Sequence, residues 1–426
     1  MALSGRAFAV ALLAVLVVLA VRSAVTIAVI DGLLLTAIVA DVLLAVPVSE
    51  LRVTRAGDTR VRLGEQATVI TTVVNTGRRP LNAQVRDAWP PSARARPYRA
   101  VLQVPPGGSG DLIMTVSPER QGDCAADRVT IRSFGPLGLA ARQRGQLLPW
   151  TVRALPPFPS RKHLPGKLAH LRELDGQHRA ALPGAGSEFD SLREYVIGDD
   201  VRSVDWRSTA RRGEVLVRTW RPERDRRIVF LLDTGRAAAG RVAGYPRLDA
   251  AMDAVQLLTA LASQAGDRID LIAVDQRIRS RVLAPARTTA LATVTGAMAT
   301  LRPELAETDW RLAAATVLAL ARRRCLVVLL TDLNPALALP ELGALLARHE
   351  LLIGAVTDPR ITELAAGRED AASVYAAAAA THFAEERVRL TAQLNRLGAT
   401  VVDAPPDRIA PALADAYLTL KSRGRL

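Results

Sequence analysis

The chain of 426 residues is poor in cysteine and in aromatic residues. Its two cysteines, Cys124 and Cys325, are too few for a disulfide scaffold or a four-thiolate zinc site. Phe, Trp and Tyr make up 4% of the sequence, so few rings are present on which nucleic-acid bases would stack. Charged residues are 23% of the chain against 49% apolar residues, which excludes a disordered protein. The length and composition predict two or three folded domains.

Several catalytic motifs are missing from the sequence as well. It contains no Walker loop, no Gly-x-Ser-x-Gly elbow and no His-Glu-x-x-His motif. The net charge of +14 is spread along the chain rather than gathered in one patch. Basic residues close to a bilayer are explained by anionic lipids and by membrane topology. We therefore expect no nucleic-acid partner.

Two long apolar stretches open the chain, residues 7–21 and 24–48, with only Arg22 and Ser23 between them. Because about 20 apolar residues span a bilayer, residues 1–48 predict two transmembrane helices. A cleaved signal peptide is the alternative for the first stretch, although no clear small-x-small cleavage site ends it. Within the second stretch, Asp31 and Asp41 are functional suspects, or they lie near a span end or are protonated.

Basic residues flank both apolar stretches. Arg6 precedes the first stretch, and four arginines follow the second: Arg52, Arg55, Arg60 and Arg62. The positive-inside rule then places both ends of the helical hairpin in the cytoplasm. The sequence predicts a two-pass protein of the plasma membrane whose soluble part is cytoplasmic.

The rest of the chain divides by composition. Short Val- and Thr-rich stretches separated by turn signals predict a small antiparallel β-sandwich over residues 49–155. Residues 156–187 are rich in Pro, Gly and Arg and are interpreted as a linker. A segment with a distinctive sequence, residues 188–225, comes next. Apolar strands alternating with helical patterns over residues 226–426 predict a parallel, doubly wound α/β domain.

Three acidic residues stand at the carboxyl ends of predicted strands in this last domain: Asp233, Asp332 and Asp358. In open α/β sheets, ligands bind beyond the carboxyl ends of the strands. These aspartates are the sharpest chemical signal in the chain.

The segment 184–218 reads GAGSEFDSLREYVIGDDVRSVDWRSTARRGEVLVR, and residues 134–139 read FGPLGL. With the apolar N-terminus, these sequences resemble the bacterial family catalogued as domain of unknown function fifty-eight. The resemblance implies a C-terminal domain similar to a von Willebrand factor A domain. It also implies an association with MoxR-type AAA+ ATPases or transglutaminase-like proteins, and thus a bacterial plasma membrane.

A von Willebrand factor A domain binds Mg²⁺ through an Asp-x-Ser-x-Ser motif, a loop threonine and a later aspartate. Asp233, Thr308 and Asp332 match three of these five ligands, but Gly235 and Ala237 replace both serines. The resemblance therefore implies a degenerate metal site, with no cofactor expected and Mg²⁺ as the alternative. Pairing of Asp233 with a nearby arginine is favoured over metal binding.

Acidic and arginine residues interleave in the 188–225 segment. Bidentate ion pairs would let it brace the domain that follows. Alternatively it is a docking surface, with Arg193, Asp205, Trp206 and Arg207 binding a partner, because Trp and Arg dominate interface energetics. Both interpretations stay open at this point.

The sequence thus predicts a membrane-anchored, non-enzymatic adaptor that presents a von Willebrand factor A-like domain to a partner. A MoxR-type AAA+ ATPase is the partner that the resemblance implies, in complex assembly or maturation. The alternative is a Mg-dependent phosphoryl-transfer or hydrolytic enzyme that uses Asp233 and Asp332.

Overall fold

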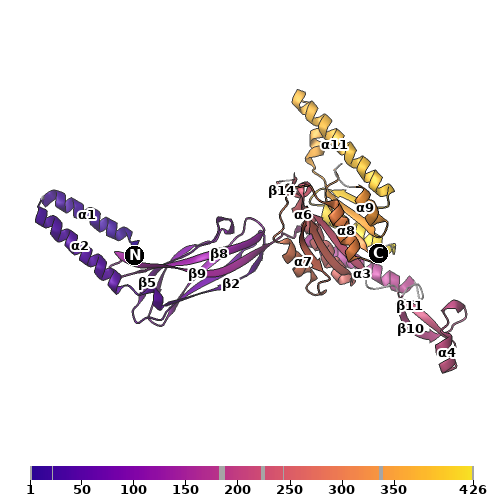
Figure 1. Ribbon diagram of the computed structural model, residues 1–426, viewed down its shortest axis with the longest axis horizontal. Coiled ribbons are helices and arrows are strands. Elements are labelled where there is room, and N and C mark those ends of the chain that lie inside the picture. Colours follow the sequence, from indigo (N-terminus) through magenta and orange to yellow (C-terminus); the bar gives the residue numbers. More distant parts are fainter. Residues whose placement is uncertain are drawn as a thin grey trace. The chain divides into compact units, whose positions relative to one another are not determined.

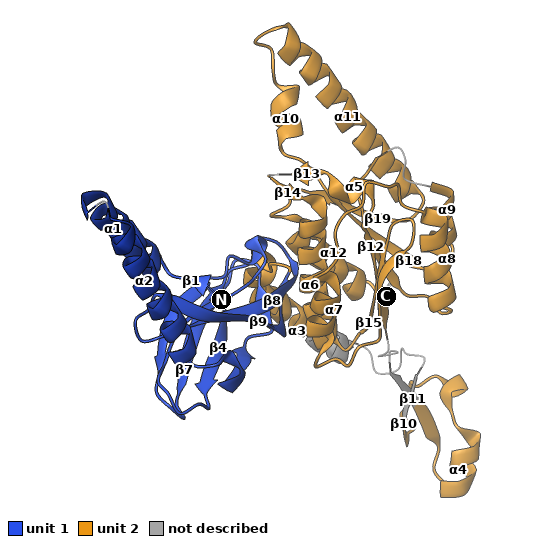
Figure 2. Cartoon of the chain, turned by 60° about the vertical axis from the view of Figure 1, so that its left-hand side comes forward, with its two compact units in different colours: residues 1–155 blue, residues 156–426 orange. Residues whose placement is uncertain are grey.

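The computed structural model describes residues 2–21, 23–181, 188–221, 226–242, 244–334 and 339–424. The chain forms two compact units, residues 1–155 and residues 156–426 (Figure 2). Each unit has its own hydrophobic core, and each is described by itself below.

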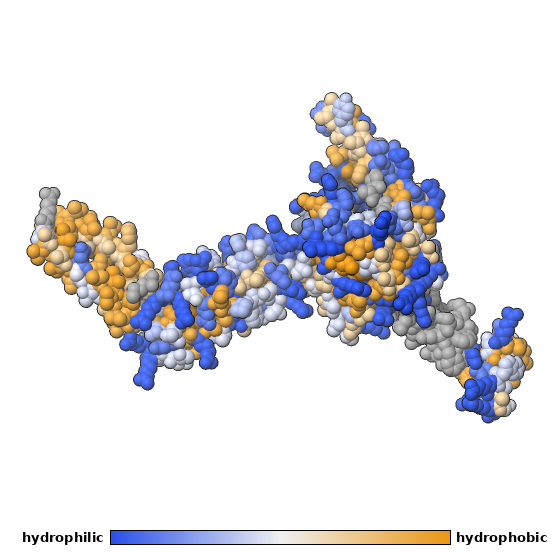
Figure 3. Space-filling model, viewed as in Figure 1, coloured by the Kyte–Doolittle hydropathy of each residue, from blue (hydrophilic) through white to orange (hydrophobic). Residues whose placement is uncertain are grey.

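Two apolar helices open the first unit, α1 (Gly5–Val21) and α2 (Ala24–Leu44) (Figure 1). Among the described residues, one helical stretch is long and apolar enough to cross a membrane: the 27 residues Ala24–Glu50, formed by α2 and the short helix η1 (Val48–Glu50). The other predicted span, which corresponds to α1, has 17 residues and is a shorter apolar helix. Most large apolar side chains of both helices are exposed, as the orange surface in Figure 3 shows. Such a surface suits lipid better than water.

The remainder of the first unit confirms the predicted antiparallel sheets. One sheet has the order β2-β4-β7, formed by Leu51–Gly57, Ala67–Asn75 and Ser109–Val116. The other has the order β1-β9-β8-β5-β6, formed by Ala2–Leu3, Ala140–Leu155, Gly122–Phe134, Leu81–Asp87 and Arg99–Val104. The short strand β3 (Arg60–Arg62) pairs in parallel with β9. Alternate side chains of both sheets share one apolar core, because successive residues of a strand face opposite sides.

Asp41, near the end of α2, joins this helix to the sheet. Its carboxylate is fully buried and accepts hydrogen bonds from the backbone N–H groups of Leu137, Leu139 and Ala140, at 2.8, 2.7 and 2.8 Å. Gly135 lies so close that a Cβ there would be 2.2 Å from the carboxylate Oδ1 atom. The FGPLGL sequence is therefore a loop that wraps a buried carboxylate, and Asp41 has a structural role at the end of the apolar helix.

The second unit begins with a segment that differs from the predicted linker. Residues 159–181 are helical, as the short helix η3 (Pro159–His163) and as α3 (Leu164–Ala181). The physical reason is a set of leucines at helical spacing: Leu164, Leu168, Leu171 and Leu174 pack against the core of the α/β domain. The Pro- and Gly-rich composition concealed this pattern. Residues 182–187 lie outside the described ranges.

The 188–221 segment forms a small substructure of its own. Strands β10 (Glu188–Glu194) and β11 (Leu216–Arg221) pair antiparallel, and the helices η4 (Val201–Ser203) and α4 (Trp206–Arg212) lie between them in sequence. We call residues 188–221 the arm. Of the two interpretations left open for this segment, an extended ionic brace and a docking surface, the extended form differs from the structure, in which the segment folds back on itself as a hairpin with Arg–Asp pairs inside it.

The α/β domain contains a six-stranded sheet with the order β16-β15-β12-β17-β18-β19. Its strands are Ile278–Leu283, Arg268–Val274, Arg227–Asp233, Leu326–Leu330, Glu350–Val356 and Thr400–Ala404. All neighbours pair in parallel except β16, which is antiparallel to β15. The predicted parallel strands are therefore present, with one antiparallel edge strand.

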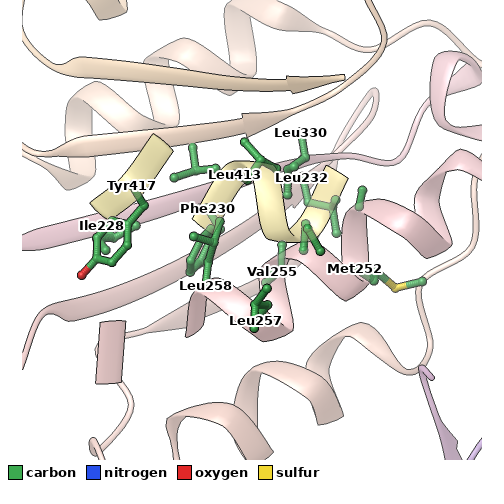
Figure 4. Packing of buried hydrophobic residues seen from close by; sticks show 14 of the residues in the cluster. Ile228, Phe230, Leu232, Met252, Val255, Leu257, Leu258, Leu330, Leu413 and Tyr417 are labelled. Atoms are coloured by element: carbon green, nitrogen blue, oxygen red, sulfur yellow. The ribbon is translucent and has the colours of Figure 1, made fainter. Parts of the chain in front are cut away.

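Helices cover both faces of this sheet. On one face lie α6 (Arg247–Ala265), α7 (Ala290–Met298) and α12 (Ile409–Ser422), and side chains of α6 and α12 pack on Ile228, Phe230 and Leu232 (Figure 4). The other face is covered by α8 (Trp310–Leu320), α9 (Leu339–Leu346) and α11 (Ala371–Arg396). The short elements α5 (Arg236–Ala239), β13 (Arg241–Val242), β14 (Tyr245–Pro246) and α10 (Arg360–Ala365) lie in the connections. Burial on both faces explains why the strands read as continuous apolar runs.

Replacing Asp41 by Ala should destabilise the first unit by about 3 kcal/mol, because three buried backbone N–H groups would lose their acceptor. Thermal unfolding of the detergent-solubilised protein, followed together with proteolysis of the 135–140 loop, measures the effect. Asp31→Ala is the matched control, since Asp31 is exposed on the same helix. Equal unfolding temperatures for the two variants would contradict the structural role of Asp41.

Candidate functional site

The candidate site lies at the carboxyl edge of the α/β sheet. Asp233 ends β12, and Asp332 follows the end of β17, the strand beside it. Parallel neighbours end at the same edge, so the two aspartates line one small cleft together with Thr308. The structure thus brings together all three residues predicted as the degenerate metal site. Asp358, predicted to lie at the same edge, is outside this cleft, and its carboxylate accepts the backbone N–H of Arg360.

Asp233 is 1% exposed and is held by neutral donors. Its Oδ1 atom accepts hydrogen bonds from the Gly235 backbone N–H at 2.8 Å and the Thr308 hydroxyl at 2.5 Å. Its Oδ2 atom accepts a hydrogen bond from the Thr331 hydroxyl at 2.6 Å. Burial raises the pKa of Asp233 above its usual value, and these hydrogen bonds oppose the rise only in part.

The predicted pairing of Asp233 with an arginine is wrong for the part of the chain that the structure describes. The hydroxyls of Thr308 and Thr331 occupy the positions that a guanidinium would need. Arg236, the nearest candidate in sequence, is exposed and lies 3.9 Å from Glu307 instead. Arginine pairing occurs at the neighbouring strand end.

The glycine at position 235 is explained by the approach of Thr308. A Cβ atom on Gly235 would lie 2.2 Å from the Thr308 hydroxyl oxygen and 2.8 Å from the Ala306 carbonyl oxygen. A serine at this position, as in a complete metal-binding motif, would displace the threonine. The absence of a serine side chain at position 235 therefore leaves the space in which Thr308 makes its close contact with Asp233.

Asp332 is bound by two arginines from different helices. Arg387 of α11 donates to Oδ1 at 2.5 Å, and Arg247 of α6 lies 2.8 Å from Oδ2. Arg387 also contacts Asp403 of β19 through Nη2 at 2.7 Å. Burial acts to lower the pKa of Arg387, but its contacts with Asp403 and Asp332 raise that pKa on balance. Asp332 and Arg387 are buried, and together with the more exposed Asp403 they form a network in which every charge has an opposite partner.

Thr234, one residue out of register with the metal-binding motif, faces another acid. Its hydroxyl donates to Asp275 at 3.1 Å, and Asp275 is also paired with Arg279. Burial acts to raise the pKa of Asp275, but the hydrogen bonds of Arg279, Arg277 and Thr234 lower it overall. The Thr234 hydroxyl therefore donates its hydrogen bond to a residue of a neighbouring loop.

These contacts do not fit a divalent cation. Mg²⁺ needs near-octahedral oxygen ligands at about 2.0–2.1 Å. The oxygens of Asp332 already face two guanidinium groups, and those of Asp233 accept hydrogen bonds from the protein itself. The cleft has a cavity volume of about 10 Å³, roughly the space of a single water molecule. In the described ranges, no group of three His, Cys, Asp or Glu side chains is placed to hold a metal.

The four predicted partner-binding residues all lie in the arm. Arg193 pairs with Asp199 through two hydrogen bonds, at 2.8 and 2.5 Å, and this contact lowers the pKa of Asp199. Asp205 caps α4 by accepting the Ser208 N–H at 2.9 Å and also pairs with Arg218 at 2.7 Å. Trp206 is 65% exposed, and Arg207 is exposed beside it. Arg193 and Asp205 therefore shape the arm, while Trp206 and Arg207 face outward.

Sequence reasoning did not identify Thr331, Arg247, Arg387 or Asp403. Thr331 adjoins Asp332, so the sequence could have identified it as a second polar residue at the end of the same strand. The others come from two helices and the last strand, with separations of up to 156 residues between Arg247 and Asp403. No local pattern marks them.

These features define the class of protein: an α/β domain with a cleft at the carboxyl edge of its sheet, preceded by a hairpin arm. Residues 191–393 match the family described as "Protein of unknown function DUF58". The match begins within β10 and ends within α11, so it includes most of the arm and of the sheet.

Relatives are found in mycobacteria. Proteins named as uncharacterized from Mycobacterium bovis and Mycobacterium tuberculosis are 33% identical to this chain over 201 residues. The match covers 45% of this chain and 61% of each relative, so the chain spans about three fifths of the length of these relatives.

Among the solved structures that match the chain, two that cover about a quarter of it are only distantly similar. A CARDB domain from Pyrococcus furiosus is 15% identical with a TM-score of 0.19, covering 24% of this chain and 86% of that one. The cupredoxin domain of amoB from Nitrosocaldus yellowstonii is 12% identical with a TM-score of 0.17, also covering 24% and 86%. Likeness at this level carries no functional information.

Asp332→Asn should destabilise the second unit by about 3–5 kcal/mol, because Arg247 and Arg387 would lose a buried carboxylate partner. Chemical denaturation of the purified protein measures the change. Glu307→Gln, an exposed substitution at the same cleft, is the control and should have little effect. A loss below about 1 kcal/mol for Asp332→Asn would show that the network is dispensable.

Asp233→Asn should have the opposite effect and stabilise the protein at neutral pH. The folded-state pKa of Asp233 lies above its unfolded value, so the stability contributed by this group falls as pH rises through that interval. An amide stays neutral and keeps the same three contacts, with its NH₂ group donating to Thr331. We expect the stability gain of the variant to grow as pH rises above about 4, the ordinary range of an aspartate, and to vanish below it. Thermal unfolding at a series of pH values tests this, and a variant less stable than wild type at neutral pH would refute it.

Proposed function

We propose that the chain is a membrane-anchored interaction protein that presents a von Willebrand factor A-like domain to a protein partner. The partner class is a MoxR-type AAA+ ATPase or a transglutaminase-like protein, and the process is the assembly or maturation of a complex. The soluble part works at the cytoplasmic face of a bacterial plasma membrane, held there by a two-pass hairpin.

The observation that carries this proposal is the state of the two strand-end carboxylates. Both oxygens of Asp233 accept hydrogen bonds from protein donors, and Asp332 is neutralised by two arginines. A nucleophile or general base needs a free lone pair directed at a substrate. In the described structure protein donors take up three of the roughly four acceptor positions of Asp233, and Arg247 and Arg387 neutralise the charge of Asp332, which favours binding over catalysis.

The sheet order supports the von Willebrand factor A-like assignment. Counting the strands of the domain along the chain from β12, the order is 3-2-1-4-5-6, with the third strand antiparallel. The parallel order is that of doubly wound α/β folds, whose ligand crevice lies where the strand order reverses. Asp233 ends the first strand, which stands at that reversal.

Membrane attachment rests on α2 and its flanks. Of the basic residues used to orient the hairpin, Arg6, Arg52 and Arg60 are exposed. Arg55 is buried and paired with Asp87 at 2.7 Å inside the β-sandwich, so it contributes nothing to the flank. The remaining residues still favour a cytoplasmic location for both ends.

Affinity capture of the tagged full-length protein from its native membranes should retrieve a MoxR-type ATPase. Because the site does not suit Mg²⁺, chelation by EDTA should not reduce capture, and Asp233→Asn should capture as well as wild type. Quantitative mass spectrometry against untagged membranes provides the readout.

Three results would count against the proposal. Absence of the ATPase in every condition would remove this partner class. Phosphatase or hydrolase activity that disappears in Asp233→Asn would replace the adaptor by an enzyme. Loss of capture both in EDTA and in Asp233→Asn would restore a functional metal site.

A further inference from the structure

The arm is a small substructure with little core of its own. Among its described side chains, the buried apolar ones are Val204, Leu216 and Val217. A two-stranded hairpin without a larger apolar face is marginally stable in water. The arm therefore gains from being covered by another surface.

Among the arm side chains whose burial the structure describes, five large apolar ones are exposed instead. We call them the arm surface; they are Val196, Ile197, Val201, Trp206 and Val215. Ile197 is 96% exposed and Trp206 65%. In Figure 3 apolar and charged residues lie side by side on the visible face of the arm.

Backbone hydrogen bonds bring these side chains to one region. The Tyr195 N–H donates to the Val215 carbonyl at 2.8 Å, and the Asp205 N–H donates to the Leu216 carbonyl at 2.8 Å. The turn that carries Val196 and Ile197 and the start of α4 at Trp206 therefore both adjoin residues 215–216. Three separate stretches of the arm thus contribute apolar side chains to a common surface.

The charge beside Trp206 is positive. Helix α4 carries Arg207, Arg211 and Arg212 and no acidic residue. All three are exposed, and in the ranges described none has an ion pair. The arm's Asp199 and Asp205, by contrast, are already paired with Arg193 and Arg218. The exposed carboxylates of Asp200 and Glu214 adjoin Val201 and Val215, so the basic part of the arm surface is α4, and negative charge on an occupant would complement α4.

The edge of the hairpin favours a protein as that occupant. Among the residues that the structure describes, β10 pairs with β11 alone, whereas β11 also meets Val204 through a bridge at Val217. An open strand edge of this kind offers backbone N–H and C=O groups to an added strand, which a lipid surface does not use.

We propose that the arm surface docks onto a partner protein that presents apolar residues surrounded by acidic side chains. Trp206 and Ile197 are the apolar anchors, and Arg207, Arg211 and Arg212 contact the acidic rim. This inference rests on the proposed adaptor function, and it identifies the arm, rather than the carboxyl edge of the sheet, as the part that binds.

The chain is well suited to a cysteine-accessibility test. Its own thiols, Cys124 and Cys325, are both buried, and burial raises the pKa of Cys325 to about 12. A maleimide reagent will therefore report almost entirely on an introduced cysteine. Ile197→Cys places the probe on the arm surface, and Glu385→Cys on the exposed side of α11 is the matched control.

Maleimide labelling of the full-length protein is compared in three settings. These are neutral detergent, vesicles of purified protein with anionic phosphatidylglycerol, and native membranes. We expect Ile197→Cys to react as fast as the control in the first two, and about tenfold more slowly in native membranes, where most copies would be docked. Adding Arg207→Glu and Arg211→Glu should restore fast labelling there.

Each other pattern overturns the proposal. Protection in detergent would mean that the arm is covered by its own chain. Protection in anionic vesicles would identify lipid as the occupant. Equal labelling in all three settings would show an uncovered arm, and protection that survives the charge reversal would exclude an acidic rim.

The outcome is independent of the ATPase capture. Protection of Ile197→Cys without capture of a MoxR-type ATPase would retain the arm as the docking site and change the partner. Capture that persists when the arm is unprotected would retain the adaptor function and place its binding site elsewhere.

Discussion

The ion-pair network centred on the buried Asp332 and Arg387, with Arg247 and Asp403 as more accessible partners, is the interaction on which the α/β domain depends most. It ties the end of β17 to helices on both faces of the sheet, because Arg247 belongs to α6 and Arg387 to α11. Through Asp403 it also reaches β19 at the far edge. Taking such charges out of water is tolerable only when each one is paired, so the geometry of the whole carboxyl edge follows from this set.

At the same edge of the sheet, residues predicted to bind a ligand make contacts within the protein instead. Parallel strands must end side by side, so polar residues at their ends are brought together whether or not a ligand is bound. Here Gly235 opens space that the Thr308 hydroxyl fills, and Thr331 completes the set of donors to Asp233. In the first unit, Asp41 is a parallel case, because a carboxylate in an apolar helix is satisfied by three backbone N–H groups of one loop. In both places a carboxylate that looks functional in the sequence serves as an acceptor that organises a loop.

Much of the architecture could be read from local patterns. Strands such as Arg227–Asp233 are apolar along their whole length, and alternation in Ala67–Asn75 marks a strand with one buried face. The linker prediction failed where leucines at helical spacing were interspersed with Pro, Gly and basic residues, as in α3. The arginine–carboxylate pairs expected of the arm are present, but they join residues near one another in sequence, such as Arg193 and Asp199, so they close the arm's own turns.

Thr308 was indicated only by the family resemblance, whereas the sequence pattern by itself determined the order of elements, the apolar N-terminus and the two aspartates that meet at the sheet edge, Asp233 and Asp332. These follow from periodicity and from strand ends, which are local properties. Only the tertiary structure decided which donor each acid receives. Arg387 lies 55 residues from Asp332, and Thr308 lies 75 from Asp233. Contacts between residues so far apart in the sequence depend on how helices pack across a sheet, and no pattern within one element encodes that packing.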